Sequence, residues 1–376
     1  MPLRHSRASA AAAFFVQGMV FISLTTRLPV TQRTWDLSET EMSMMMLMMV
    51  LLAGVGSFVA EQVAKRVSSA GVLRVGLVAI AATLPLMAFA NSLTMFLAAL
   101  GTYGVALGAV DATTNAQAVA VEHQYGRPLL PSFYGAWTLG GLVGSGWALI
   151  SPGLGAMGWL SVIALAVGLG ARLIKRAPVI DPDSVKVPLK PLLLVGAGLV
   201  LFYMVDTAAQ TWGPTYLGHT LNSPTRLVAL ATFPYLLASG LMRLLGDRLV
   251  EKMGAPRVLK LGAVASALSL GLIVVAPTWQ VAVIGFTVLG ASAAVIAPLS
   301  FSAAARIAAG SGEAGTDRVD AVIARFNQFN YLGALLGSVA TGLVGANSLR
   351  YGFALPMVLI LLLIPLAPAF AGQEDR

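Results

Sequence analysis

A chain of 376 residues, of which 57% are hydrophobic and only 11% are charged, has too little polar surface to cover a soluble globule. Soluble domains carry about 25% charged residues, so the composition predicts a polytopic membrane protein and excludes a soluble enzyme. The chain has no cysteine, and its three histidines lie near segment ends, so we expect no disulfide, no metal site and no cofactor. The net charge of +8 lies mainly between apolar segments, which indicates membrane topology rather than nucleic-acid binding.

Twelve apolar segments approach the length of about 20 residues that a bilayer-spanning helix requires. They lie at about 9–30, 42–60, 71–91, 93–118, 131–151, 155–174, 191–213, 226–246, 257–277, 279–305, 321–345 and 352–372. With the N-terminus inside, 20 of the 24 Lys and Arg residues fall on the cytoplasmic side. The positive-inside rule therefore predicts a multi-pass protein of a plasma (inner) membrane, with both termini cytoplasmic.

The first two segments carry features that each allow two interpretations. Arg27 ends the first segment, where it is either an interfacial arginine or an outer-gate residue that pairs with Asp206 or anchors a substrate anion. The run MSMMMLMM at 42–49 offers soft thioether ligands, but its methionines surround the helix and have no cysteine or central histidine beside them. We therefore interpret this run as flexible packing.

The fourth segment carries an acid where a lipid-facing residue would be expected. Gly101, Gly104, Gly108, Asp111 and Asn115 recur at steps of three or four residues, so they share one helical face. A carboxylate near the bilayer centre costs roughly 2.5–3.5 kcal/mol or more, so this face must look into protein or a water-filled cavity. We expect Asp111 to carry a coupling proton and Asn115 to line a substrate cavity. The alternative is a buried acid held in a structural ion pair.

Polar and aromatic residues in the fifth and eleventh segments are further candidates for a substrate cavity. Tyr134 and Trp137 lie one turn apart. They are either aromatic platforms for a substrate ring or anchors at the membrane interface. Asn327 and Asn330 lie on one face of the eleventh segment, where they either bind substrate hydroxyls or join helices.

The seventh segment carries the second intramembrane acid. Asp206 shares a face with Tyr203 and Gln210, and we expect it to take part in proton coupling beside Asp111, with both neighbours lining the cavity. Neither acid has an acidic counterpart 186 residues away, where Ala297 and Val20 stand. A purely structural acid would more often be duplicated with the scaffold.

An internal duplication divides the chain. The two halves align at a constant offset of 186, which pairs Gly54 with Gly240, Glu61 with Asp247 and Gly76 with Gly262. Such duplication is typical of transporters built from two repeats. We predict an N-terminal six-helix bundle at 1–176, a cytoplasmic linker at 177–190 and a C-terminal six-helix bundle at 191–376.

The stretch GLMRLLGDRLVEKMGAPR at 240–257 resembles the signature loop of the major facilitator superfamily. The resemblance implies an all-α membrane fold of twelve transmembrane helices in two pseudo-symmetric six-helix halves. It also implies a cytoplasmic gate at this loop. The alternative is that these charged residues only mark the cytoplasmic end of a helix. The gate residues are Asp247, Arg243, Arg248, Gly254 and Arg257, with Glu61 in a degraded first-half copy where Ser68 stands opposite Gly254.

The stretches DATTNAQAVAVEHQYGRP and SFYGAWTLGGLVGSG are similar to an under-characterised bacterial branch of this superfamily, related to fucose-permease-like symporters. Tyr134 and Asp206 depart from that branch, where histidine and glutamate are typical. The resemblance implies a secondary active transporter of a small organic solute, working by alternating access and coupled to protons. We expect a monomer whose partners are the solute, protons and the lipid bilayer.

Two alternatives remain open at this point. One is multidrug or amphiphile efflux by proton antiport, which would suit the methionines and the aromatic pair of the fifth segment. The other is a non-transporting membrane receptor or partner-binding protein on the same fold, in which two unduplicated intramembrane acids would have no obvious use. No GxxxxGK[ST] or GxSxG pattern occurs, so we expect neither ATP drive nor enzymatic activity.

Overall fold

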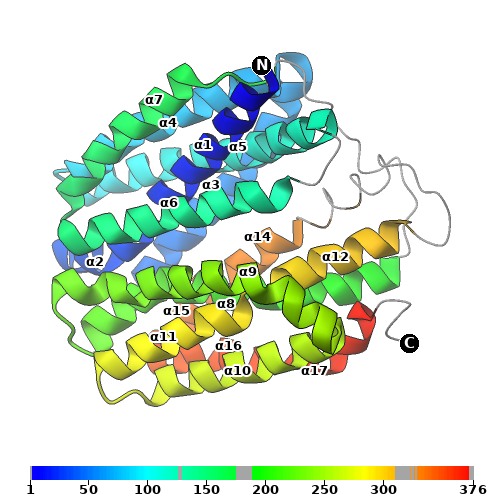
Figure 1. Ribbon diagram of the computed structural model, residues 1–376. Helices are drawn as coiled ribbons and strands as arrows, with labels where there is room; N and C mark the ends of the chain where they lie inside the picture. Colours follow the sequence, from blue (N-terminus) through cyan, green and yellow to red (C-terminus); the bar gives the residue numbers. More distant parts are fainter. Residues whose placement is uncertain are drawn as a thin grey trace. The chain divides into compact units, whose positions relative to one another are not determined.

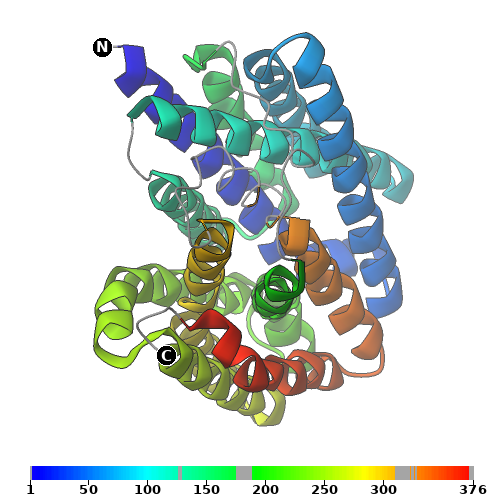
Figure 2. The ribbon, with the colours of Figure 1, turned by 90° about the vertical axis from the view of Figure 1, so that its right-hand side faces the viewer.

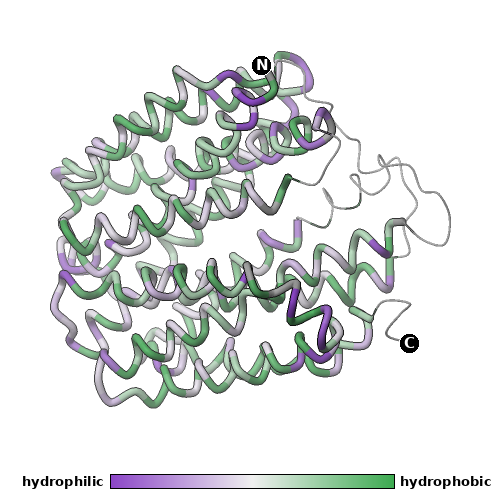
Figure 3. Tube along the Cα trace, in the orientation of Figure 1, coloured by the Kyte–Doolittle hydropathy of each residue, from purple (hydrophilic) through white to green (hydrophobic). Residues whose placement is uncertain are grey.

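The computed structural model describes residues 2–125, 129–174, 189–309, 322, 326 and 328–371 (Figure 1). Over these residues the chain is helical and contains no strand. Nine of the described helices are long and apolar enough to cross a membrane, and shorter apolar helices accompany them. Hydrophilic residues lie mainly at helix ends and in loops, as Figure 3 shows. The chain divides into two compact units, Met1–Val179 with Pro224–Ala229, and Ile180–Ser223 with Leu230–Arg376, whose helices can be followed by colour in Figure 2.

The first unit contains seven α-helices and one 3-10 helix. They are α1 (Pro2–Thr26), α2 (Leu28–Trp35), α3 (Glu39–Arg66), α4 (Ser69–Ala88), α5 (Leu93–Tyr125), α6 (Leu130–Ile150), η1 (Leu154–Trp159) and α7 (Leu160–Gly170). The apolar segment expected at 9–30 breaks at Arg27 because Pro29 can occupy only the first turn of a helix, and α2 begins there. Helix α3 begins with a capping box, in which Ser38 and Glu41 satisfy each other's backbone N–H groups.

The second unit contains the remaining helices. They are α8 (Leu189–Thr215), η3 (Tyr216–Thr220), α9 (Phe233–Met253), α10 (Ala255–Val275), α11 (Trp279–Ala293), α12 (Ile296–Ala309), α14 (Gln328–Leu335), η5 (Leu336–Ala340), α15 (Thr341–Val344), α16 (Leu349–Leu359), η6 (Ile360–Leu362), α17 (Leu363–Leu366) and η7 (Ala367–Phe370). The 3-10 helix η4 (Thr225–Ala231) begins among the residues that group with the first unit, where Arg33 Nη1 donates to Thr225 Oγ1 at 2.9 Å.

The packing of each unit repeats at the sequence offset of 186. A β-carbon at Gly104 of α5 would collide with the carbonyl oxygen of Met49 in α3. At the equivalent place in the second unit, a β-carbon at Gly290 of α11 would collide with the carbonyl oxygen of Tyr235 in α9. Glycine is required at both positions because two helix backbones touch there. Met49 corresponds to Tyr235 and Gly104 to Gly290 at the offset of 186, so the duplication extends to helix contacts.

Candidate functional site

A chain of hydrogen bonds joins three helices of the first unit. Gln17 Nε2 of α1 donates to Asp111 Oδ1 of α5 at 2.8 Å. Asn115, one turn further along α5, donates through Nδ2 to the Asp111 carbonyl at 2.9 Å and to Asp111 Oδ1 at 3.5 Å. Tyr134 of α6 donates through its hydroxyl to Asn115 Oδ1 at 3.1 Å. The structure thus brings together Asp111, Asn115 and Tyr134, three of the residues singled out in the sequence, and adds Gln17.

Helix packing fixes this cluster in place. A β-carbon at Gly108, one turn before Asp111, would collide with the carbonyl oxygen of Ala53, so α5 lies directly against α3. The ring of Tyr134 packs edge-on against Phe14, with ring centroids 5.5 Å apart, and this contact aims its hydroxyl at α5. The cluster is therefore held by backbone approach on one side and by aromatic packing on the other.

Gln17 gives the cluster an additional hydrogen-bonding atom. Its side chain is only 6% exposed, and within the described part of the chain its Oε1 accepts no hydrogen bond. A buried polar atom without a partner costs free energy, so a solute, water or proton-bearing group that donates to it would be stabilised there. The arrangement presents a carboxylate, two amides and a phenol, which together can both donate and accept hydrogen bonds.

The acid of the second unit has different partners. Tyr235 of α9 donates through its hydroxyl to Asp206 Oδ1 of α8 at 2.6 Å, the short distance expected for a hydrogen bond to a carboxylate. Gln210, one turn along α8 and 2% exposed, also hydrogen-bonds this acid, and the positive charge of Arg243 acts on it. Asp206 and Gln210 are thus brought together as the sequence suggested.

Other predicted cavity residues lie in α6, α8 and α14, and one lies outside the described residues. Trp137 of α6 packs against Phe21, with ring centroids 6.4 Å apart. Tyr203 of α8 is half-buried and packs edge-on against Phe202 at 5.0 Å. Asn330 lies half-buried in α14, and Asn327 lies outside the described residues. Roles of these side chains in binding a solute stay predictions.

Arg27 is fully buried and makes four hydrogen bonds within its own unit. Its Nη1 donates to the carbonyl and hydroxyl oxygens of Ser23, Nη2 donates to the Ser151 carbonyl at 2.7 Å, and Nε donates to the Gly153 carbonyl at 3.1 Å. These bonds join the end of α1 to the turn after α6. They support a structural role, and the gate pairing with Asp206 stays a prediction.

The signature loop at 240–257 shows why its glycine stands where it does. Gly254 has φ +78° at the junction of α9 and α10, a conformation that side-chain-bearing residues rarely adopt. In the first-half copy, Ser68 has an extended backbone and instead accepts a hydrogen bond from Gly71 N at 3.1 Å. The loop therefore uses backbone freedom in one half and a serine cap in the other.

The charged residues of the predicted gate are only partly described. Arg248, Arg257 and Glu61 are exposed at helix ends, and Arg243 is half-buried in α9. The side chain of Asp247 lies outside the described residues. The gate contact between this acid and the nearby arginines stays a prediction.

The methionine run of α3 supports the packing interpretation. Met42, Met45, Met46 and Met49 are at most 4% exposed and belong to the core of the first unit, whereas Met44 is 49% exposed. Across the described residues, no three His, Cys, Asp or Glu side chains gather as metal ligands. The thioethers therefore fill space between helices.

Sequence reasoning missed two residues that contact the intramembrane acids, Gln17 and Tyr235. An available signal for Gln17 was its place as a lone amide inside the apolar run FFVQGMVF. Tyr235 gave a weaker signal because a tyrosine near a segment end is usually an interfacial anchor.

The sequence comparisons with known proteins find a transporter superfamily and individual transporters. The sequence profile of the Major Facilitator Superfamily matches residues 194–376. An uncharacterized transporter, y4wD, of Sinorhizobium fredii is 27% identical over 384 residues, covering 95% of this chain and 96% of that protein. An uncharacterized MFS-type transporter of Yersinia pestis is 26% identical over 373 residues, covering 94% of this chain and 92% of that protein.

Solved structures resemble the chain over nearly its full length. A point mutant of the nucleoside transporter NupG superposes with a TM-score of 0.74 at 14% identity, covering 97% of this chain and 99% of that one. A D-xylose-proton symporter gives 0.73 at 14% identity, covering 98% of both chains, and the transporter FucP gives 0.65 at 15% identity, covering 98% of this chain and 99% of that one. At these identities the similarity shows the fold, so the predicted fold of twelve helices in two pseudo-symmetric halves is confirmed.

Proposed function

We propose that the chain is a member of the major facilitator superfamily and a secondary active transporter that couples protons to the movement of a small, polar organic solute across the plasma membrane by alternating access. The observation that carries this proposal is the cluster of Gln17, Asp111, Asn115 and Tyr134. An acid inside a membrane-spanning helix is expensive and is usually retained for binding or coupling.

Asp111 has the surroundings that a reversible proton site needs. In the ionised form its Oδ1 accepts from the amides of Gln17 and Asn115. In the protonated form its hydroxyl can donate to Gln17 Oε1, which accepts no bond within the described residues, after the amide rotates about its terminal bond. Both protonation states can therefore be hydrogen-bonded at the same place.

The cluster also favours a polar solute. Amide and phenol groups can donate to and accept from hydroxyl or carbonyl groups, and sites built this way discriminate strongly against analogues that lack them. Several structural neighbours are a nucleoside transporter or sugar–proton symporters, which is consistent with a hydroxyl-bearing solute. The buried methionines give no specific support to efflux of an amphiphile.

Asp206 is the proposed partner acid. Its carboxylate accepts a short hydrogen bond from the Tyr235 hydroxyl, so α9 holds it in place while Asp111 exchanges a proton. This division assigns the coupling proton to the first unit and leaves Asp206 to contact solute or to position Arg243.

Reconstitution tests the proposal. A thermal-stabilisation screen of the purified protein against sugars, nucleosides and other polar solutes supplies a substrate, and proteoliposomes then measure counterflow and accumulation driven by an imposed pH gradient. We expect Asp111→Asn to abolish accumulation while counterflow at equal pH continues.

The matched control is Asp36→Asn, the same acid-to-amide change at an exposed residue directly after α2, which should leave accumulation unchanged. If Asp111→Asn still concentrates solute under a pH gradient, the coupling role passes to Asp206. If the wild-type protein shows no counterflow of any solute that stabilises it, a non-transporting receptor is the better description.

A further inference from the structure

A basic pocket of about 510 Å³ lies in the first unit, at the end of the bundle where α1 begins and α5 ends. It is lined by Arg4, Arg7, Ala8 and Ala11 of α1 and by Tyr125 of α5. The lining combines three polar residues with two alanines, so the pocket has a cationic rim and an apolar wall. None of its residues belongs to the cluster around Asp111.

The rim is partly ordered by an aromatic contact. The guanidinium carbon of Arg7 lies 5.9 Å from the centroid of the Tyr125 ring, the geometry of a cation–π interaction. Arg4 stands one turn earlier on α1 and is exposed, whereas Arg7 is half-buried. Because Arg7 is held over the ring, the two guanidinium groups remain on one side of the pocket, where each presents several N–H donors.

The nearby acid on α5 is already engaged. Glu122, one turn before Tyr125, accepts hydrogen bonds from the backbone N–H groups of Leu129 and Leu130 at the start of α6. This carboxylate therefore caps a helix, where the positive end of the dipole stabilises it. The pocket keeps two arginines that no described acid of its lining opposes.

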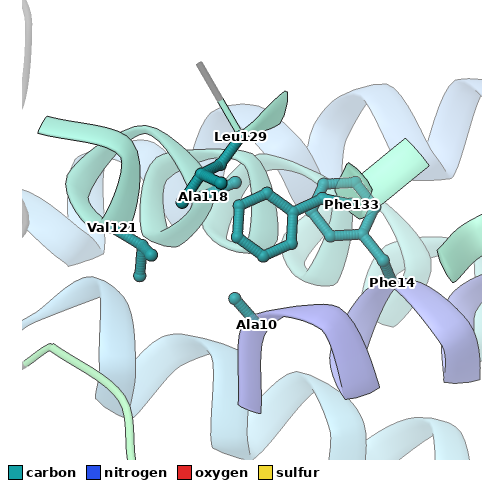
Figure 4. Packing of buried hydrophobic residues seen from close by; sticks show 6 residues of the cluster. All are labelled: Ala10, Phe14, Ala118, Val121, Leu129 and Phe133. Atoms are coloured by element: carbon teal, nitrogen blue, oxygen red, sulfur yellow. The ribbon is translucent and has the colours of Figure 1, made fainter. Parts of the chain in front are cut away.

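The floor of the pocket is rigid. Ala11 and Tyr125 pack against a buried apolar cluster that joins α1, α5 and α6. In Figure 4 Phe14 and Phe133 lie side by side at its centre, and their ring centroids are 5.8 Å apart. The other members of the cluster are Ala10, Ala118, Val121 and Leu129. A ligand that enters the pocket therefore meets a preformed wall, which lowers the entropy lost on binding.

We propose that this pocket binds the phosphate group of an anionic phospholipid, with the two arginines on the phosphate and the alanine wall against the glycerol and upper acyl chain. The positive-inside argument places this end of the bundle at the cytoplasmic leaflet, where anionic headgroups concentrate. Free phosphate shares the chemistry of the headgroup, but the apolar wall gives it nothing to contact.

Native mass spectrometry of the full-length protein tests the site. The protein is equilibrated in detergent with equal amounts of phosphatidylglycerol and phosphatidylcholine, and retained lipid is counted. We expect selective retention of phosphatidylglycerol by the wild type and a loss of affinity of about thirtyfold in Arg4→Gln/Arg7→Gln, since each arginine near an anionic headgroup contributes about a fivefold gain.

The control is Lys65→Gln/Arg66→Gln, which removes the same charge from the exposed end of α3 in the same unit. Retention that survives in the control and falls in the pocket variant supports the site. An equal loss of lipid retention in both variants would mean that the net charge of the protein causes the effect, and would overturn the proposal. Displacement of phosphatidylglycerol by inorganic phosphate, with no dependence on acyl chains, would assign the pocket to a soluble phosphate and overturn the lipid assignment. Arg7→Lys, which keeps the charge, separates misfolding from loss of binding, because it should retain most of the lipid.

Discussion

The two intramembrane acids sit in clusters of different construction. Asp111 is joined to Gln17 and Asn115 through amides, and the bonds run across α1, α5 and α6. Asp206 is joined to Tyr235 by one short bond between α8 and α9 and lies in the field of Arg243. Amides and phenols can each donate to an ionised acid or accept from a protonated one. The comparison indicates that the duplicated scaffold carries one acid in a network of amides across three helices and one acid bonded to a tyrosine of a single neighbouring helix.

The largest expected difference is between the two alanine variants. Asp206→Ala leaves two buried donors, the Tyr235 hydroxyl and the Gln210 amide, without their acceptor, at a cost of about 1–3 kcal/mol for each. Asp111→Ala removes the acceptor of neutral amides and should cost about 1–3 kcal/mol. Thermal unfolding of the detergent-purified variants at one heating rate measures both. A larger fall in melting temperature for Asp111→Ala would show that Asp206 is not the more firmly hydrogen-bonded of the two acids.

Matched tyrosine variants sharpen the comparison at the level of one hydroxyl. Tyr235→Phe removes a bond to a carboxylate, worth about 1.5–3 kcal/mol, and Tyr134→Phe removes a bond to the Asn115 amide, worth about 0.5–1.5 kcal/mol. Both changes keep the ring and its packing. We expect about twice the loss of unfolding free energy for Tyr235→Phe in a denaturant titration. Equal losses would mean that the Tyr235 hydrogen bond is not the stronger of the two.

A double-mutant cycle tests whether Gln17 acts on Asp111. In unfolding free energy, Gln17→Leu and Asp111→Ala should be coupled by about 0.5–3 kcal/mol, because each removes one end of the same 2.8 Å bond. The cycle of Gln17→Leu with Asp206→Ala is the control and should be additive. Coupling in the control and none in the test pair would contradict the cluster as described.

Arg27 gives the smallest expected effect. Its guanidinium donates to Ser23, Ser151 and Gly153, all in the first unit, so Arg27→Ala and Asp206→Ala should add within about 0.3–0.5 kcal/mol. Unfolding free energies of the two single variants and the double variant provide the measurement. A clear coupling would instead support the outer-gate pairing predicted from the sequence and would connect the two clusters energetically.

The sequence predicted those features that depend on residues of a single helix. Hydropathy marks each span, and the spacing of Asp111 and Asn115 predicts their contact because residues four apart share a helical face. The break at Arg27 was missed although Pro29 offered a signal, because the apolar run continues through it.

The partners of the acids could not be predicted in the same way. Gln17 is 94 residues from Asp111, and Tyr235 is 29 residues from Asp206. Which residues meet at such separations depends on how helices rotate and approach one another. That is decided by glycine contacts such as Gly104 on Met49 and Gly108 on Ala53, and no local pattern reports it.

The contact between Gly290 and the backbone of Tyr235 predicts where mutations that abolish function should occur. After duplication, the ancestral glycine contact survived in both copies, with Met49 in one and Tyr235 in the other. The tyrosine copy uses the fixed backbone to hold a hydroxyl 2.6 Å from Asp206, while the methionine copy buries a thioether. A genetic selection for lost transport should therefore recover alleles at codon 290 that leave the solute site itself unchanged. Alleles at codon 104 should act instead through the contact between α3 and α5, because the Met49 side chain makes no hydrogen bond to an acid that such an allele could break.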